Sequence, residues 1–210
     1  MPDSPRPAGI KSALNVPNQV TLARLVMSLV LFVFLSLGWY MTSVVLFAIA
    51  AGTDWVDGYW ARKYGQVTQL GRILDPFADK LIICGTFVFL AAVPRLADGT
   101  LASGIAAWMA VVILGRELLV TALRSFVEHR GGDFSASWSG KWKMLVQCLA
   151  AGWSMVQLTY FDAASAAWLS TPPDWMTQGL TVVVWLALVL TLYSGLEYVR
   201  AAIRMLREAA

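Results

Sequence analysis

Apolar residues along this chain gather into six long runs that are separated by shorter polar stretches. The runs cover approximately residues 20–40, 42–62, 74–96, 103–125, 143–162 and 177–200. Each run is close to the roughly 20 residues that an α-helix needs to cross about 30 Å of hydrocarbon. The ten-residue alternating segments of a membrane β-barrel do not occur in the sequence. The pattern predicts an all-α, polytopic membrane protein with six transmembrane helices.

The first residues differ from the rest of the chain. Residues 1–19 contain four prolines and mixed polar residues, and they lack the apolar core of a signal peptide. We expect a short cytoplasmic segment at the membrane interface, followed by one membrane domain over residues 20–210. Pro17 is expected to break the chain there, so that Asn18 caps the first transmembrane helix.

Composition and charge support this interpretation and orient it. The chain is 58% hydrophobic and only 14% charged, which is not the composition of a soluble domain. Lysine and arginine concentrate in alternate connections, and such residues favour the cytoplasmic side of a membrane. Both termini and the connection from Arg62 to Arg72 are therefore expected in the cytoplasm. Because the net charge of +3 is distributed in this way, we expect anionic membrane lipids as partners and not nucleic acid.

Four aspartates stand out against these apolar runs. Asp54 and Asp57 are three residues apart near the end of the second predicted helix. Asp75 and Asp79 are four residues apart at the start of the third, where Asp75 with Pro76 is also expected to form the helix N-terminus. Each pair would share one helix face. Because carboxylates at membrane depth are costly unless they surround positive charge, the four predict a site for divalent metal ions.

The ligand type indicates which chemistry such a site supports. Oxygen ligands favour Mg²⁺, Mn²⁺ or Ca²⁺ over zinc or copper. Four closely placed aspartates can hold two ions about 3.5–4 Å apart, an arrangement suited to phosphoryl displacement. Gly58 and Ala61 share the helix face of Asp54 and leave room for a ligand. The pattern favours pyrophosphate chemistry at the membrane surface.

A second group of charged residues begins in the fourth apolar run. Arg116 lies inside this run, Arg124 follows two helical turns later, and Lys141 comes near the start of the fifth helix. An arginine at this depth needs a partner. Two explanations stay open: Arg116 pairs with Glu117 or one of the aspartates, or it lines a pocket for an anion such as phosphate.

The aspartates belong to a longer motif. The pattern Asp54-x2-Asp57-Gly58-x2-Ala61-Arg62-x8-Gly71-x3-Asp75-x3-Asp79 resembles, position for position, the signature of the CDP-alcohol phosphotransferase family. The resemblance extends over nearly the whole chain, because this family also has six transmembrane helices and cytoplasmic active-site residues. It implies a membrane enzyme, expected as a homodimer in the bacterial inner membrane.

The resemblance also implies roles for single residues. Asp54, Asp57, Asp75 and Asp79 would ligate two divalent metal ions, Mg²⁺ or Mn²⁺, with Asp79 as the general base as well. The residues implied for binding the cytidine nucleotide are Asn18, Thr21, Gly58, Ala61, Arg62, Thr68 and Gly71. In the implied reaction an acceptor hydroxyl loses its proton to Asp79 and attacks the lipid-bearing phosphorus of CDP-diacylglycerol, which releases CMP.

The acceptor is indicated by the second charged group. The run Gly115–Arg124, followed by Gly140-Lys141-Trp142-Lys143, resembles the branch of the family that uses glycerol 3-phosphate. Arg116, Arg124 and Lys141 are then expected to bind the acceptor's phosphate. Met144 departs from this branch, which often has threonine there. Inositol phosphate is the main alternative acceptor.

Two functions of other classes are weaker alternatives. A divalent-cation transporter would also place aspartates inside a membrane. However, the four carboxylates lie toward one end of their helices, and the sequence contains no second cluster for the other face. A purely structural scaffold would have no reason to bury four aspartates.

Overall fold

The computed structural model describes residues 16–64, 69–129 and 138–208, and within them the chain forms six α-helices and one small β-hairpin. The elements are α2 (Val16–Ser36), α3 (Tyr40–Tyr64), α4 (Gln69–Ala91), α5 (Ala107–His129), α6 (Trp138–Leu158), β1 (Phe161–Asp162), β2 (Ala167–Trp168) and α7 (Asp174–Glu208). The two strands pair antiparallel between α6 and α7. The all-α prediction is confirmed, and each predicted run corresponds to one helix.

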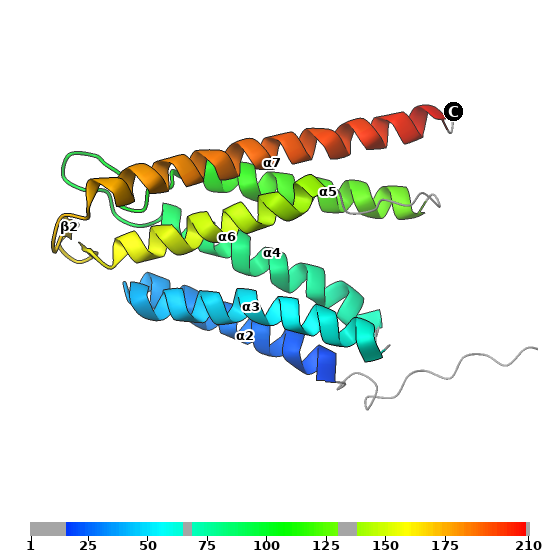
Figure 1. Ribbon diagram of the computed structural model, residues 1–210, viewed down its shortest axis with the longest axis horizontal. Coiled ribbons are helices and arrows are strands. Elements are labelled where there is room, and N and C mark those ends of the chain that lie inside the picture. The colour runs from blue at the N-terminus through cyan, green and yellow to red at the C-terminus, as the bar shows by residue number, and fades with distance from the viewer. Residues whose placement is uncertain (1–15, 65–68, 130–137, 209–210) are drawn as a thin grey trace, which may run out of the picture.

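Successive helices run in opposite directions (Figure 1). One end of the bundle therefore collects the starts of α2, α4 and α6 together with the ends of α3, α5 and α7. Helix α4 packs against α2, α5 and α6, while α6 also packs against α3 and α7. The two helices α4 and α6 thus connect the α2–α3 pair with the α5–α7 pair.

Apolar side chains from all six helices fill the space between them. The most deeply buried include Leu31, Phe47, Phe87, Ile113, Met155 and Val184, which come from α2, α3, α4, α5, α6 and α7 in that order. Close packing of α2 on α4 depends on Gly85. A Cβ atom at this position would lie 2.1 Å from the Phe32 ring, so only glycine fits without movement.

The outside of the bundle is also apolar. Leu22 on α2, Val111 on α5 and Val182 on α7 are each more than half exposed. Among the described residues, two stretches are long and apolar enough to span a membrane: Gln19–Ser36, with mean hydropathy 1.9, and Asp174–Met205, with 2.0. These features indicate a membrane protein. That all six helices cross the membrane stays a prediction.

Two predicted helix starts are wrong. Helix α2 begins at Val16, so Pro17 lies in its first turn and Asn18 lies inside the helix instead of capping it. A proline is tolerated there because the first amides of a helix have no carbonyl partner. Helix α4 begins at Gln69, so Asp75 is not its N-cap and Pro76 lies within it. Membrane helices tolerate such prolines because their surroundings satisfy the freed carbonyl. Residues 1–15 of the predicted interfacial segment lie outside the described residues.

The opposite end of the bundle carries two aspartates in the connections between helices, Asp98 in a loop and Asp162 at the end of β1. The backbone amide of Thr100 donates to the carboxylate of Asp98, and Ser165 donates its hydroxyl and amide to Asp162. These hydrogen bonds hold the pKa of both carboxyl groups below the usual value. Asp98 follows the end of α4 and Asp162 follows the end of α6, so both order local turns at the end of the bundle opposite to the aspartates of α3 and α4.

Candidate active site

The predicted metal ligands lie on the last part of α3 and the first part of α4. Asp54 and Asp57 are separated by about one turn of α3, and Asp75 and Asp79 by about one turn of α4. Only residues 65–68 connect the two helices, so both pairs belong to the same end of the bundle. The side chains of Asp54, Asp57 and Asp75 lie outside the described part of the structure, whereas that of Asp79 is described.

Asp79 forms an ion pair with an arginine of the first helix. The Nη1 atom of Arg24 donates to Oδ1 of Asp79 over 2.8 Å. The arginine side chain is 4% exposed and the aspartate side chain 32%. A buried guanidinium therefore holds one oxygen of a carboxylate that solvent can still reach. From the sequence, Arg24 is expected as a snorkelling arginine near the cytoplasmic boundary, in a Pro17-Asn18-x2-Thr21-x2-Arg24 opening that resembles the branch of the family that uses glycerol 3-phosphate. Its pairing with Asp79 is a finding of the structure.

A polar stripe on α2 surrounds this arginine. Thr21, Arg24 and Ser28 recur at helical spacing, and each is at most 3% exposed. The Ser28 hydroxyl donates to the carbonyl oxygen of Arg24 over 2.8 Å. The stripe faces the bundle, where α2 packs on α3 and α4. Thr21 is thus buried on the side of α2 that carries the Asp79 contact.

Most of the predicted nucleotide-binding residues have no described side chain. Gly58, Ala61 and Arg62 lie in the helical backbone of α3, and Gly71 lies in that of α4. Asn18 lies in the first turn of α2. Thr68 falls outside the described residues. The end of α3 and the starts of α2 and α4, which carry the described members of this set, lie at the same end of the bundle (Figure 1).

The donor set at this end fits a hard divalent cation. Carboxylate oxygens are the ligands that Mg²⁺ and Mn²⁺ prefer. Among the side chains that the structure describes, no three His, Cys, Asp or Glu residues gather. Asp79 is the only one of the four predicted ligands within that set. The aspartate positions and the partly exposed carboxylate of Asp79 are compatible with metal binding, which stays a prediction.

A second charged cluster lies between α5, α6 and α7. Glu117 accepts from Nη1 of Arg116 over 3.2 Å and also from Nζ of Lys143. Arg116 donates through Nη2 to the Ser194 hydroxyl, and its guanidinium carbon lies 5.5 Å from the centre of the Tyr198 ring. Arg116, Glu117 and Lys143 are all buried or nearly so. Two cations therefore share one carboxylate inside the bundle.

This cluster answers one question that the sequence left open. Arg116 pairs with Glu117, which is the structural explanation, yet the cluster keeps one net positive charge. The Nε atom of Arg116 is buried and has no hydrogen-bond partner among the described residues. Arg124 and Lys141 are exposed, whereas Arg116 and Lys143 are buried together. The structure thus places Lys143, not Lys141, beside Arg116.

Lys143, Ser194 and Tyr198 are the residues here that sequence reasoning missed. The sequence does contain a pattern that points to Ser194 and Tyr198. Together with Thr191 they recur at spacings of three and four in an otherwise apolar helix. Thr191 is fully buried and its hydroxyl accepts from Nε2 of Gln147 over 2.8 Å. Such contacts hold membrane helices together. This polar face of α7 meets α6 and the charged cluster.

Comparison with known proteins identifies the family of the chain. Residues 14–193 match the family described as CDP-alcohol phosphatidyltransferase. Three relatives bear the name CDP-diacylglycerol–glycerol-3-phosphate 3-phosphatidyltransferase. The protein from Bacillus subtilis (strain 168) is 32% identical, and the alignment covers 88% of this chain and 93% of the relative. The protein from Salmonella choleraesuis (strain SC-B67) is 32% identical, and the alignment covers 90% of this chain and 94% of the relative. The protein from Pseudomonas fluorescens is 36% identical, and the alignment covers 90% of both chains. The chain belongs to the CDP-alcohol phosphatidyltransferase family.

Proposed function

We propose that this protein transfers the phosphatidyl group of CDP-diacylglycerol to sn-glycerol 3-phosphate, giving phosphatidylglycerophosphate and CMP. The observation that carries this proposal is the similarity to relatives named for that reaction, which extends over about nine tenths of the chain. The aspartate pairs on adjoining ends of α3 and α4 support it, because they supply the acidic groups that the reaction requires.

Asp79 is the proposed general base. It accepts the proton of the acceptor hydroxyl as that oxygen bonds to the phosphorus bearing the diacylglycerol. The bond between this phosphorus and the oxygen of CMP breaks, so that CMP leaves with the electron pair. Arg24 holds Oδ1 of Asp79 over 2.8 Å and thereby fixes the orientation of the carboxylate. Positioning of this kind contributes a large part of catalysis in phosphoryl transfer.

Asp54, Asp57, Asp75 and Asp79 are the residues proposed to hold two Mg²⁺ or Mn²⁺ ions. When bound, such ions supply positive charge that stabilises the phosphoryl oxygens and the departing CMP. Gly58, Ala61, Arg62, Thr68 and Gly71 are proposed to receive the nucleotide, together with Asn18 and Thr21 from α2. The glycines allow close approach of a phosphate, and Arg62 supplies a charged donor.

The acceptor's phosphate is proposed to bind near Arg116, with Arg124 and Lys141 as further cations. The net positive charge of the buried cluster around Arg116 supports this, because an anion would balance it. Glycerol 3-phosphate carries such a group, whereas serine, as an acceptor, does not. A phosphorylated acceptor is therefore favoured.

All six helices are proposed to cross the bacterial inner membrane, with the aspartate end and both termini in the cytoplasm and with two copies forming a homodimer. The exposed apolar side chains on the outside of the bundle support the membrane placement. The basic residues of α5, α6 and α7 near the aspartate end support the orientation.

A panel of acceptors tests the reaction. Purified protein in detergent is given CDP-diacylglycerol, Mg²⁺ or Mn²⁺, and one of glycerol 3-phosphate, inositol phosphate, inositol or serine. We expect CMP release and a new phospholipid with glycerol 3-phosphate alone. Product with inositol phosphate instead would support the phosphatidyl transfer but show that glycerol 3-phosphate is not the acceptor. Product with none of the four would overturn the proposed function.

A further inference from the structure

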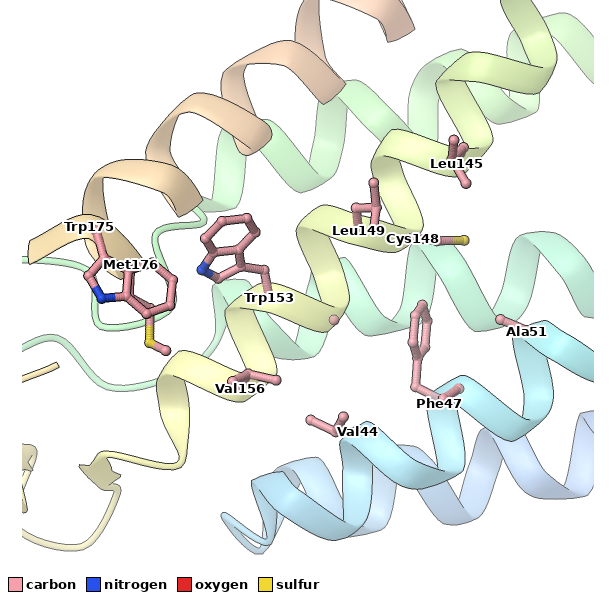
Figure 2. Close-up of a pocket in the computed structure, with 12 residues that line it drawn as sticks. Val44, Phe47, Ala51, Leu145, Cys148, Leu149, Trp153, Val156, Trp175 and Met176 are labelled. Carbon is pink, nitrogen blue, oxygen red and sulfur yellow. The ribbon is translucent and has the colours of Figure 1, made fainter. Parts of the chain in front are cut away.

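An apolar groove runs along the outside of the bundle between α3 and α6 and ends at the start of α7. Its volume is about 560 Å³, within the range of small-molecule sites. Figure 2 shows Val44, Phe47 and Ala51 of α3 below the groove and side chains of α6 above it. Trp175 and Met176 close the end that lies away from the predicted metal ligands.

The walls of this groove offer almost nothing to a polar ligand. Apart from the indole nitrogens of Trp153 and Trp175, every lining side chain consists of carbon, hydrogen or sulfur. The groove is open along its length, because Leu145 and Leu149 on its rim are about half exposed. In a membrane protein such a groove opens to lipid, and a hydrocarbon chain is the ligand that matches its apolar walls.

Gly152 indicates that the space is kept open. Glycine in a membrane helix usually allows another helix to approach closely. At Gly152, however, an added Cβ would meet no atom of the described residues within 4 Å. Ala48 and Ala51 on the facing helix are also small. Small residues that face each other without touching leave room for a ligand.

The groove points at the predicted catalytic end. Its α3 residues are Val44, Phe47, Ala48 and Ala51, which recur at spacings of three and four. Position 54 continues the same face, one turn after Ala51. A molecule whose head group is held at Asp54 would therefore meet the groove directly below it.

The length of the groove suits one acyl chain. From Leu145 to Val156 helix α6 rises by about 16 Å, at 1.5 Å per residue. Half of the hydrocarbon core of a bilayer measures about 15 Å. An acyl chain of one leaflet would therefore fit lengthwise. We propose that this groove binds one acyl chain of the lipid donor, CDP-diacylglycerol, and so helps to determine its affinity. The proposal rests on the function proposed above.

Filling the groove tests this directly. In Gly152→Leu the new Cβ meets no described atom within 4 Å, and the rest of the side chain extends into the groove that Gly152 lines. We expect the KM for CDP-dioleoylglycerol to rise by about tenfold, which corresponds to losing the burial of about two methylene groups. The kcat, and the KM for a CDP-diacylglycerol with six-carbon chains, should stay within about twofold, because the short chains do not reach past Ala51.

Gly52→Leu is the matched control. Gly52 is a helical glycine on α3, is exposed, does not line the groove, and likewise has no described atom within 4 Å of an added Cβ. It should leave both KM values unchanged. If Gly152→Leu changes neither KM, or changes both equally, the acyl-chain assignment is wrong. If the wild-type protein shows no transfer at all, the proposed function fails instead.

Cys148 gives a readout that does not depend on activity. It lines the groove and is partly exposed, whereas the other cysteine, Cys84, is buried in the bundle. In phosphatidylcholine nanodiscs we expect CDP-dioleoylglycerol to slow maleimide labelling of Cys148, and six-carbon CDP-diacylglycerol to leave the rate unchanged. An unchanged rate with the long-chain donor would mean that the groove holds resident lipid or a second copy of the chain, and would contradict the proposal.

Discussion

Single charged residues inside this bundle are held by partners on other helices. Arg24 of α2 binds Asp79 of α4, and Lys143 of α6 binds Glu117 of α5. Isolated charges in such surroundings would be strongly destabilised. Each pair therefore joins two helices, and the first also holds the carboxylate proposed as the general base, so the effects on chemistry and on stability have to be measured separately.

Replacing Arg24 should affect turnover more than substrate binding. In Arg24→Ala the Asp79 carboxylate loses a charge-assisted hydrogen bond, which is worth about 1.5–3 kcal/mol. If that energy orients the base in the transition state, kcat falls by about 10- to 100-fold while the KM for CDP-diacylglycerol changes little. Initial rates over a range of donor concentrations measure both.

Arg24→Lys provides the control for this prediction. Lysine keeps the charge but lacks the planar fork of arginine, so it should recover part of the lost kcat. Equilibrium binding of Mn²⁺ to both variants shows whether the aspartate end is still formed. Wild-type kcat in Arg24→Ala would show that the ion pair plays no part in positioning Asp79.

Glu117 should be critical for stability. In Glu117→Gln two buried cations, Arg116 and Lys143, lose their shared carboxylate, and breaking a buried ion pair costs about 3–5 kcal/mol. We expect a clearly lower unfolding temperature in detergent. The double variant Glu117→Gln/Lys143→Met should recover part of this loss, because one cation is removed. A single variant as stable as the wild type would contradict the arrangement of the cluster.

At the scale of elements, the contact between α2 and α4 determines where Arg24 meets Asp79. The two helices approach closely at Gly85, about one and two thirds turns beyond Asp79, where the ring of Phe32 lies over the glycine. Phe32 also stacks on Phe89 at 5.0 Å between ring centres. The aromatic contact and the ion pair therefore lie along the same interface.

Gly85→Ala should weaken this interface. The added methyl would lie 2.1 Å from the Phe32 ring, and overpacking of this kind costs about 1–3 kcal/mol. Gly52→Ala is the control, since no described atom lies near its new methyl, and it should gain up to about 1 kcal/mol from helix propensity. Thermal unfolding of both variants measures the difference. Equal stability would show that α2 and α4 do not pack as closely as described.

The number and position of the helices could be predicted from sequence because each apolar run has the length of one helix. Helix starts are harder to predict, because Pro17 and Pro76 resemble helix boundaries although the bundle accommodates both inside helices. The spacing of the aspartates indicated that they share helix faces. Pairing between helices, such as Arg24 with Asp79 and Glu117 with Lys143, depends on tertiary packing and leaves no local pattern in the sequence.

At the scale of the whole molecule, the bundle separates two chemically different ends. The end with the aspartates also carries the basic residues of α5, α6 and α7, whereas the loops at the opposite end contain Arg95, Asp98 and Asp162. Because helices alternate in direction, this separation follows from the order of the helices in the chain (Figure 1). The proposed cytoplasmic site requires that the two ends face opposite sides of the membrane.

Labelling of single cysteines tests this orientation. With Cys84 and Cys148 replaced by alanine, a cysteine at Asp98 or Ser165 should react with a membrane-impermeant maleimide added outside bacterial spheroplasts. A cysteine at Arg204, on the exposed face of α7 near its end, should react only after the membrane is permeabilised. Reaction of all three positions from the same side would contradict the proposed orientation.

The measurement that tests the central claim most directly is metal-dependent CMP release from CDP-diacylglycerol and glycerol 3-phosphate. Wild-type protein is compared with Asp79→Asn and with Asp98→Asn, a loop aspartate at the other end of the bundle. We predict that Asp79→Asn lowers kcat by at least about 100-fold, as expected for loss of a general base, and that Asp98→Asn behaves as wild type. Equal rates for Asp79→Asn and the wild type would show that the reaction does not depend on this aspartate.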